Sequence, residues 1–451
     1  MKISSQQTRL SGHIVVPGSK SHTIRALILA CMADGVSHIS NPLPSNDCLS
    51  TVKAVKQVGA EVDMGPEGSS VWTVKGAGKN LHLPEGKIDV GNSGSLMYFL
   101  CPVLSTLKGE CTFTGDESIC TRPVGHLIDA LNKLGAKAEC LPNPAGKKNC
   151  PPFKFSGPVD VNKTLYTEGT LSQYISGFMM AATKLNGTLH MDLSDPKETP
   201  YLTMTRLWLE SVGVKCNISP DFKKVSVDGP VDIKAFDRAV PSDWEGVAFP
   251  LIAALISDSK IVIDNIDGSG SQGDDKIVEV LQKVGADIVW DKAAGTLTVT
   301  GGKRLSGDSV IDISSFPDAI CALAVIACFI EGTTTFTDVE ICRKKETDRI
   351  WAMKTELSKL GAVLEEKGDT FIVHGHSPVK ADGSENLDFV IHGGEVESYK
   401  DHRIVMSLAC LGLGLKKGEA VIVNDAEWCS VTFPKFFEVM NTSGAGYLEV
   451  K

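Results

Sequence analysis

Basic side chains recur along this chain at points where helices are expected to begin. The N-terminus of an α-helix has free N–H groups and about half a positive charge, so it attracts anions. A lysine or arginine at such a point is disfavoured by the helix dipole, and a bound anion would explain its presence. The sequence therefore predicts a site for a pair of anionic substrates that carry phosphate or carboxylate groups. The cations concerned are Lys20, Arg25, Arg122, Lys345, Arg349 and Arg403.

Two acidic residues stand beside these cations and could transfer protons. Asp318 precedes an apolar run, so an N-cap role is as good a reading as a catalytic one, and the two roles are compatible. Glu346 belongs to a charge run, 345–349, and such runs are most often solvated helix starts. The position of this run favours a functional role over a solvated helix start. The run opens a helix at a point equivalent to those at which Arg122 and Tyr201 open helices elsewhere in the chain.

His402 lies between Asp401 and Arg403, where it could act as a general base or orient Arg403. Both readings stay open from the sequence. No cluster of His, Cys and Asp has the spacing of metal ligands, so we expect no metal ion.

The bulk composition favours a two-domain cytoplasmic protein. The chain has 451 residues, 42% of them apolar, and a formal net charge of −10. The net charge argues against nucleic acid as a partner, and the apolar runs are too short for a membrane span. No signal peptide is evident, and the 13 scattered cysteines are typical of reduced, buried thiols. Nothing in the sequence indicates a dimer surface, so we expect a monomer.

A repeated unit must position the candidate residues. Near-identical glycines recur at intervals of 72 to 83 residues, each closing an amphipathic helix that follows an apolar helix and a strand. The most economical reading of one unit is strand, helix, strand, strand, helix, strand. The closing glycines are Gly59, Gly135, Gly213, Gly285, Gly361 and Gly444. The apolar helices are expected at Arg25–Met32, Ser95–Leu107, Gln173–Leu185, Gly246–Ile256, Asp318–Ile330 and Arg403–Leu415.

Six such units in two domains predict an α/β fold with three units about a pseudo-threefold axis in each domain. We expect an N-terminal lobe at residues 18–239 and a second lobe made of residues 1–17 and 240–451. Parallel helices in such domains would aim their N-termini at one interdomain cleft.

Several motifs in this order resemble the enolpyruvylshikimate-phosphate synthases, also called 3-phosphoshikimate 1-carboxyvinyltransferases. The resemblance runs from end to end of the chain, and the Gly-Ser-Lys-Ser and Lys-Glu-Thr-Asp-Arg motifs are highly specific. The sister family that acts on UDP-N-acetylglucosamine has Lys-Asn at Lys20-Ser21 and a reactive cysteine at the position of Glu117. The matching segments are 16–27, 91–94, Arg122-Pro123, Ser172-Gln173, 272–274, 317–319, 345–349 and 401–403.

The resemblance implies a fold and an activity. The fold would be two inside-out α/β barrels that close on substrate. The activity would be transfer of the enolpyruvyl group of phosphoenolpyruvate to shikimate 3-phosphate, with release of phosphate and without a metal or organic cofactor. The implied shikimate 3-phosphate contacts are Lys20, Ser21, Arg25, Ser172, Tyr201, Asp318 and Lys345. The implied phosphoenolpyruvate contacts are Lys20, Gly94, Arg122, Gln173, Arg349 and Arg403.

The implied chemistry assigns roles to three of these residues. Asp318 would take the hydroxyl proton as the base, and Glu346 would protonate the methylene carbon as the acid, with Lys20 assisting proton transfer. Three positions depart from the family pattern, because Tyr98 and Val431 replace an Arg and a Lys, and Leu171 replaces a Ser. These departures leave two alternatives, a paralogue with another acceptor alcohol and a non-catalytic anion-binding relative.

Overall fold

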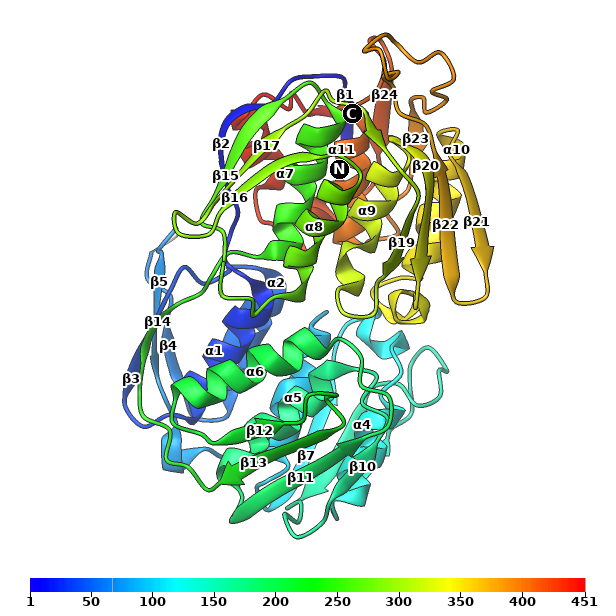
Figure 1. The fold of residues 1–451 in the computed structure, drawn as a ribbon. Coiled ribbons are helices and arrows are strands. Elements are labelled where there is room, and N and C mark those ends of the chain that lie inside the picture. Colours follow the sequence, from blue (N-terminus) through cyan, green and yellow to red (C-terminus); the bar gives the residue numbers. More distant parts are fainter. Residues whose placement is uncertain (67, 451) are drawn as a thin grey trace. The chain divides into compact units, whose positions relative to one another are not determined.

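The computed structural model describes residues 1–66 and 68–450 and divides into two compact units (Figure 1). One unit, here called the N-unit, is Gly18–Pro241. The other, here called the C-unit, combines Met1–Pro17 with the chain from Ser242 onward. The chain therefore passes from the N-unit back to the C-unit between Pro241 and Ser242. The repeat pattern predicted this boundary between residues 239 and 240.

The N-unit contains three four-stranded sheets. In each sheet one edge strand runs parallel to its neighbour, and the other pairs are antiparallel. The first sheet is closed by chain segments from both ends of the unit, because β14 pairs with β3. In strand order the sheets are β14 (Asp237–Ala239), β3 (Val36–Ser40), β5 (Val71–Lys75) and β4 (Glu61–Asp63); β6 (Ile88–Asp89), β7 (Gly109–Thr114), β9 (Phe153–Gly157) and β8 (Lys137–Cys140); and β10 (Leu165–Thr167), β11 (Gly187–Leu193), β13 (Lys224–Gly229) and β12 (Cys216–Ile218).

The C-unit repeats this pattern and uses the N-terminal segment in two of its sheets. β2 pairs in parallel with β15, and β1 pairs with β24 and β25. In strand order the sheets are β16 (Asp287–Asp291), β17 (Thr296–Thr300), β15 (Lys260–Asp264) and β2 (Ser11–Val15); β18 (Leu305–Ser306), β20 (Ile330–Thr337), β22 (Thr370–Gly375) and β21 (Val363–Lys367), with β19 (Ser309–Asp312) also on β20; and β23 (Gly394–Val396), β24 (Ala420–Val423), β1 (Lys2–Gln6) and β25 (Leu448–Val450).

Two helices accompany each sheet. The apolar helices are α1 (Lys20–Met32), α3 (Gly94–Leu104), α5 (Ser172–Ala181), α7 (Trp244–Ile256), α9 (Ile320–Ala327) and α11 (His402–Gly412). The amphipathic helices are α2 (Asn46–Gln57), α4 (Gly125–Lys133), α6 (Thr199–Ser211), α8 (Lys276–Lys283), α10 (Arg349–Lys359) and α12 (Phe436–Thr442). Short 3-10 helices are η1 (Gly78–Asn80), η2 (Ile119–Thr121), η3 (Ala182–Lys184), η4 (Gly273–Asp275), η5 (Pro317–Ala319), η6 (Glu340–Lys344) and η7 (Ala426–Val431).

The predicted order of elements within a repeat is wrong in one respect. One strand, not two, separates the apolar helix from the amphipathic helix, so a repeat reads strand, helix, strand, helix, strand, strand. The reason is the sheet topology, because strands with the same direction need a crossover and both helices supply one. The remaining strands run antiparallel to their neighbours and need no helix between them.

The closing glycines end the amphipathic helices as the pattern predicts. All six have φ between 85° and 113°, the left-handed region that favours glycine just after a helix. The chain then turns back into a strand of the same sheet.

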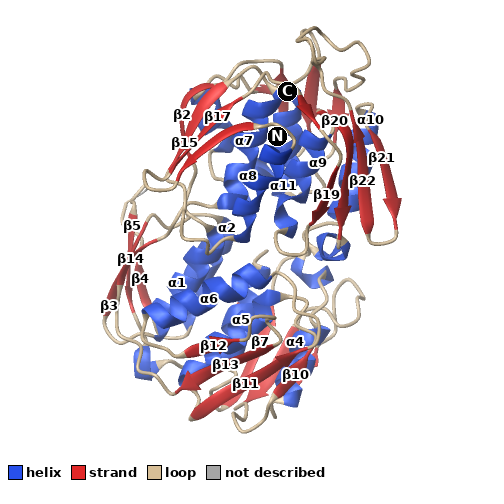
Figure 2. Ribbon diagram, viewed as in Figure 1, coloured by secondary structure: helices blue, strands red, loops and turns tan. Residues whose placement is uncertain are grey.

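The apolar helices form the core of each unit. In the C-unit, α7, α9 and α11 contact one another and are buried along their whole length. Figure 2 shows these three helices with the sheets of the C-unit around them. In the N-unit, α3 contacts both α1 and α5. A helix that is apolar on all sides must be buried by neighbouring helices and sheets. Each sheet, in contrast, keeps one face exposed to solvent.

Two further features bear on the class of protein. In the described part of the chain, no helix is both long and apolar enough to cross a membrane. The 13 cysteines are free, and all except Cys140 are buried.

Candidate active site

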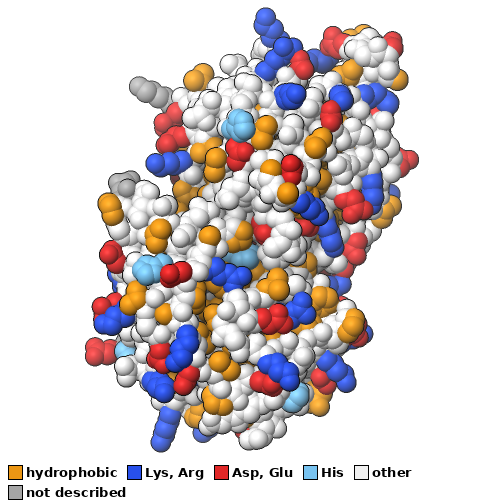
Figure 3. Space-filling model, turned by 60° about the vertical axis from the view of Figure 1, so that its left-hand side comes forward, with side chains coloured by type: hydrophobic (Ala, Val, Ile, Leu, Met, Phe, Trp, Pro, Cys, Tyr) orange, Lys and Arg blue, Asp and Glu red, His pale blue; other side chains and the backbone are white. Residues whose placement is uncertain are grey.

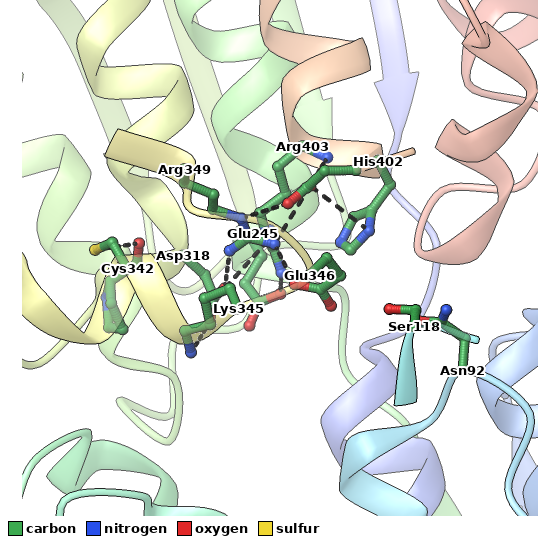
Figure 4. Close-up of polar contacts among 12 residues, drawn as sticks. Asn92, Ser118, Glu245, Asp318, Cys342, Lys345, Glu346, Arg349, His402 and Arg403 are labelled. Atoms are coloured by element: carbon green, nitrogen blue, oxygen red, sulfur yellow. Dashed lines mark hydrogen bonds and ion pairs between the residues drawn. The ribbon is translucent and has the colours of Figure 1, made fainter. Parts of the chain in front are cut away.

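A cluster of charged side chains lies at helix starts in the C-unit. Asp318 is in η5, just before α9, while Arg349 is the first residue of α10 and Arg403 is the second of α11. Arg349 Nη1 lies 2.5 Å from Asp318 Oδ1, and Arg403 Nε lies 3.2 Å from the same oxygen (Figure 4). Asp318 therefore joins the starts of three helices.

Two more predicted residues belong to this cluster. Lys345 Nζ lies 3.4 Å from Asp318 Oδ2, and Arg349 Nη2 lies 2.7 Å from Glu346 Oε2. The N-cap of α10 is Asp348, whose carboxylate accepts a hydrogen bond from Trp351 N–H at 3.0 Å. The structure thus brings together both predicted carboxyls and three predicted cations, although they are far apart in sequence.

The protonation of Asp318 follows from its neighbours. Burial alone would raise its pKa, but Lys345 and then Arg349 outweigh burial and hold the pKa below the ordinary value of 3.8. Asp318 is therefore ionised at neutral pH and able to accept a proton.

Asp401 and Glu245 complete the cluster and were not assigned roles from the sequence. Asp401 caps α11 by accepting from Arg403 N–H at 2.9 Å, and its Oδ2 lies 2.8 Å from Arg349 Nε, with both side chains fully buried. Glu245, the second residue of α7, pairs with Arg403 Nη2. Acidic residues are common at N-caps, as with Asp401, and in first helical turns, as with Glu245, so the sequence assigned neither a role in the site.

His402 is buried, with 1% of its surface exposed, and its Nδ1 lies 4.0 Å from Asp401 Oδ1 (Figure 4). The ring thus lies beside the carboxylate that caps α11 and holds Arg349.

The N-unit places a second set of predicted residues at helix starts. Lys20 is the first residue of α1, which begins earlier than the predicted Arg25. Its Nζ lies 3.4 Å from Asp47 Oδ2 in the first turn of α2, and both side chains are largely buried. Asp47 Oδ1 has no hydrogen-bond partner among the described residues, so this oxygen can still accept a hydrogen bond. The sequence showed Asp47 only as an ordinary helix-start acid.

Arg122 lies over the start of α3. Its Nη2 donates to Asn92 Oδ1 at 2.8 Å and to Ser118 Oγ at 3.2 Å. A Cβ atom added to Gly94 would lie 3.4 Å from Arg122 Nη1, so the absent side chain leaves the guanidinium close to the helix N-terminus. That these two residues bind an anion stays a prediction from the sequence.

The start of α5 carries Ser172 and Gln173, and both are held by neighbouring helices. Ser172 donates from N–H and Oγ to Glu198 Oε2, at 3.2 Å and 3.0 Å. Gln173 Nε2 donates to Ser95 Oγ at 3.2 Å and so links α5 to α3.

Arg25 is placed differently from the other predicted cations, because it is 1% exposed. Its guanidinium donates to the carbonyls of Ser21 at 3.0 Å and Tyr201 at 3.3 Å, and it stacks over the Phe99 ring at 4.5 Å. Burial lowers its pKa to about 9. Arg25 therefore supports the backbone of two predicted contacts, Ser21 and Tyr201.

The three departures from the family pattern are part of the interior. Tyr98 is buried and its hydroxyl donates to Pro123 O at 3.1 Å, while Val431 is buried and Leu171 is partly buried. None of these side chains brings a positive charge.

The charged surface and the possible metal ligands also bear on the class of site. On the face drawn in Figure 3, acidic and basic side chains are interspersed. Among residues 1–66 and 68–450, no three His, Cys, Asp or Glu side chains are grouped to hold a metal ion. The structure therefore offers no ligand set to assign, and the expected lack of a metal or cofactor stays a prediction.

The fold is that of an α/β protein, and each unit carries charged side chains at its helix starts. The profile of the family described as EPSP synthase (3-phosphoshikimate 1-carboxyvinyltransferase) matches residues 4–440. The chain belongs to this family.

Full-length relatives agree with this assignment. A protein of Ruminiclostridium cellulolyticum is 36% identical over 98% of this chain and 99% of its own. A protein of Methanocaldococcus jannaschii is 34% identical over 100% of this chain and 99% of its own. Both are named 3-phosphoshikimate 1-carboxyvinyltransferase. A solved structure of EPSP synthase from Acinetobacter baumannii is 26% identical, covers both chains fully and has a TM-score of 0.79.

Proposed function

We propose that this protein transfers the enolpyruvyl group of phosphoenolpyruvate to a ring hydroxyl of shikimate 3-phosphate and releases phosphate. The observation that carries the proposal is the ion-paired cluster of Asp318, Glu346, Arg349 and Arg403 in a chain of this family. The reaction belongs to the synthesis of chorismate and aromatic amino acids. Monomeric state, cytoplasmic location and the lack of a nucleic-acid partner stay predictions from the sequence.

The positive side chains of the N-unit and the C-unit suit two anionic substrates. We propose that Arg122, Arg349 and Arg403, with Gly94, Gln173 and Lys20, bind phosphoenolpyruvate. Shikimate 3-phosphate would contact Lys20, Ser21, Arg25, Ser172, Tyr201, Asp318 and Lys345. Because these residues come from both units, the proposal includes an active site in a cleft between them, and the finer fold proposal is an inside-out barrel in each unit. Guanidinium and ammonium groups would hold two anions together that otherwise repel each other.

The carboxyls would carry out addition and elimination. In the addition, the hydroxyl oxygen bonds to the substituted carbon of phosphoenolpyruvate, Asp318 takes the hydroxyl proton, and the methylene carbon receives a proton from Glu346. In the elimination, the Glu346 carboxylate takes a proton from the methyl carbon and the C–O bond to phosphate breaks, which restores the double bond and releases phosphate. Lys20, beside Asp47, would assist proton transfer. Exclusion of water would prevent simple hydrolysis of phosphoenolpyruvate.

Phosphate release in the presence of both substrates tests the proposal. We expect turnover only with shikimate 3-phosphate and phosphoenolpyruvate together, and a loss of kcat of roughly 100-fold or more in Asp318→Asn and in Glu346→Gln. Glu366→Gln is the matched control, because Glu366 lies on β21 of the same unit and pairs with Arg343 and Lys354 outside the cluster. Absence of phosphate release at saturating substrates would reject the acceptor.

The alternatives are a relative with another acceptor alcohol and a non-catalytic anion-binding relative. Neither is favoured, because the full-length relatives named above share one name. Growth rescue of an aromatic-amino-acid auxotroph by this chain would exclude both.

A further inference from the structure

The segment that leads into α11 has a strained backbone. Tyr399 and Lys400 have φ of 53° and 60°, in the left-handed region that costs energy for residues other than glycine. Asp401 N–H donates to Ser398 O at 2.9 Å, which makes the segment a tight turn. Two adjacent residues in this conformation persist only if their surroundings hold them.

A buried carboxylate accepts hydrogen bonds from two residues of this segment, Glu397 and Tyr399. Glu356, in α10, is fully buried. Its Oε1 accepts from the Tyr399 hydroxyl, and its Oε2 accepts from Glu397 N–H at 3.0 Å and from Lys359 Nζ at 2.7 Å. The Trp351 ring, one helical turn before Glu356, packs edge-on against Tyr399 at 5.1 Å.

The same helix also contacts Asp401, the last residue of the turn. Arg349 precedes Glu356 by two helical turns, which places both side chains on one face of α10. Arg349 Nε lies 2.8 Å from Asp401 Oδ2, and Asp401 in turn accepts from Arg403 N–H. Helix α10 therefore contacts the 397–401 turn at two points, through Glu356 and through Arg349.

We propose that Glu356 and Tyr399 are positioning residues that hold the strained 397–401 turn against α10. In doing so they set Asp401, and through it Arg349 and Arg403, in the geometry that binds phosphoenolpyruvate. The inference rests on the proposed function for the identity of the anion. The hydroxyl of Tyr399 is a donor at all working pH values, because burial and the Glu356 carboxylate raise its pKa.

Tyr399→Phe removes the hydroxyl and keeps the ring that packs on Trp351. We expect the KM for phosphoenolpyruvate to rise about fivefold or more, since one buried hydrogen bond to a charged group is lost and the turn can relax. The KM for shikimate 3-phosphate should change less than about twofold. Glu356→Gln should show a smaller effect than Glu356→Ala, because the amide oxygen can still accept from Tyr399.

The matched control is Tyr447→Phe. The Tyr447 hydroxyl is also buried in the C-unit, where it contacts Cys410 Sγ at 3.9 Å near the far end of α11. We expect this variant to keep both KM values, whatever its melting temperature. A merely structural role for Tyr399 predicts the same behaviour for both tyrosine variants.

Amide hydrogen exchange tests the positioning without turnover. Tyr399→Phe should speed exchange at residues 399–403 and leave the sheet amides of the C-unit unchanged. The proposal is overturned if both KM values and the exchange at 399–403 match the wild type, or if exchange accelerates across the whole unit while both KM values rise equally. If the wild type shows no turnover, the proposed function fails, and the exchange data decide the positioning role alone.

Discussion

The carboxylate of Asp318 shows how single residues are tuned at this site. Lys345, Arg349 and Arg403 all lie within ion-pair distance of it, and the first two lower its pKa. A carboxyl with a lowered folded-state pKa stabilises the fold above the unfolded pKa, and this stabilisation is lost as the pH falls through the folded pKa. Acid should therefore weaken the cluster that the proposed reaction needs.

Asp274 is tuned in the opposite direction. It is buried in η4, and burial, followed by Asp318 and Asp243, raises its pKa well above 3.8. Its contribution to stability is therefore full below 3.8 and is lost as the pH rises through the raised pKa. We expect Asp274→Asn to raise the melting temperature relative to wild type at about pH 7.5, with the difference shrinking toward about pH 4.

Thermal unfolding across that pH range measures the effect of Asp274→Asn. Asp129→Asn on the exposed side of α4 is the control and should show no such trend. A difference that is constant with pH would contradict the assigned protonation of Asp274.

Glu245 gives a prediction about substrate affinity. Its carboxylate pairs with Arg403, the cation proposed to bind phosphoenolpyruvate, so the substrate must share or displace this partner. We expect Glu245→Gln to lower the KM for phosphoenolpyruvate by roughly threefold, because an amide is a weaker competitor than a carboxylate. Steady-state kinetics with saturating shikimate 3-phosphate provide the measurement, and an increased KM would show that Glu245 positions Arg403 instead.

At the scale of elements, close helix packing sets the separation of the helix starts that carry the site. Gly177 of α5 lies against α3, and a Cβ atom there would overlap the Tyr98 carbonyl oxygen and come within 2.9 Å of Pro102 Cγ. The two helices carry Gly94 at one start and Ser172 and Gln173 at the other. Their approach therefore fixes the spacing of three predicted substrate contacts.

Gly177→Ala should force α3 and α5 apart. We expect a loss of about 1–3 kcal/mol in the free energy of unfolding, because neither the backbone nor a proline ring can move aside easily. Gly125→Ala, at the start of α4, is the control, since its Cβ would meet Asn149 Cβ at an ordinary 3.6 Å. Urea denaturation measures both variants, and equal stability of Gly177→Ala and wild type would contradict the packing argument.

At the scale of the whole molecule, the residues proposed to bind substrate belong to two different units. Asp318, Glu346, Arg349 and Arg403 belong to the C-unit, whereas Lys20 and Arg122 belong to the N-unit. Each set is internally paired, as with Arg349 and Asp318 or Lys20 and Asp47. We propose that both substrates are needed to join the two sets.

Small-angle scattering tests this proposal on the intact chain. We expect shikimate 3-phosphate with inorganic phosphate to decrease the radius of gyration, because ligands that bind both units favour a closed state. Sulfate at matched ionic strength is the control. An unchanged radius of gyration, with ligand occupancy shown by calorimetry, would exclude closure.

The sequence by itself determined the period of the fold, the family and the types of residue in the site. A repeat is visible because every unit must bury an apolar helix and turn at a glycine with positive φ, as at Gly59 and Gly361. The cations and carboxyls are visible because the proposed chemistry needs their charges. The order of strands in each sheet is not visible from the sequence. Periodicity shows where strands occur, but it does not show which neighbours pair in parallel.

Only the tertiary structure decided which charges meet. The partners of Arg349 and Arg403 include Asp401 and Glu245, and the partner of Lys20 is Asp47. Each of these acids lies in an ordinary helix start, where local sequence predicts a cap or a favourable dipole contact and nothing more. Contacts between helices that are distant in the chain depend on packing, and packing is set by the shape of the whole core.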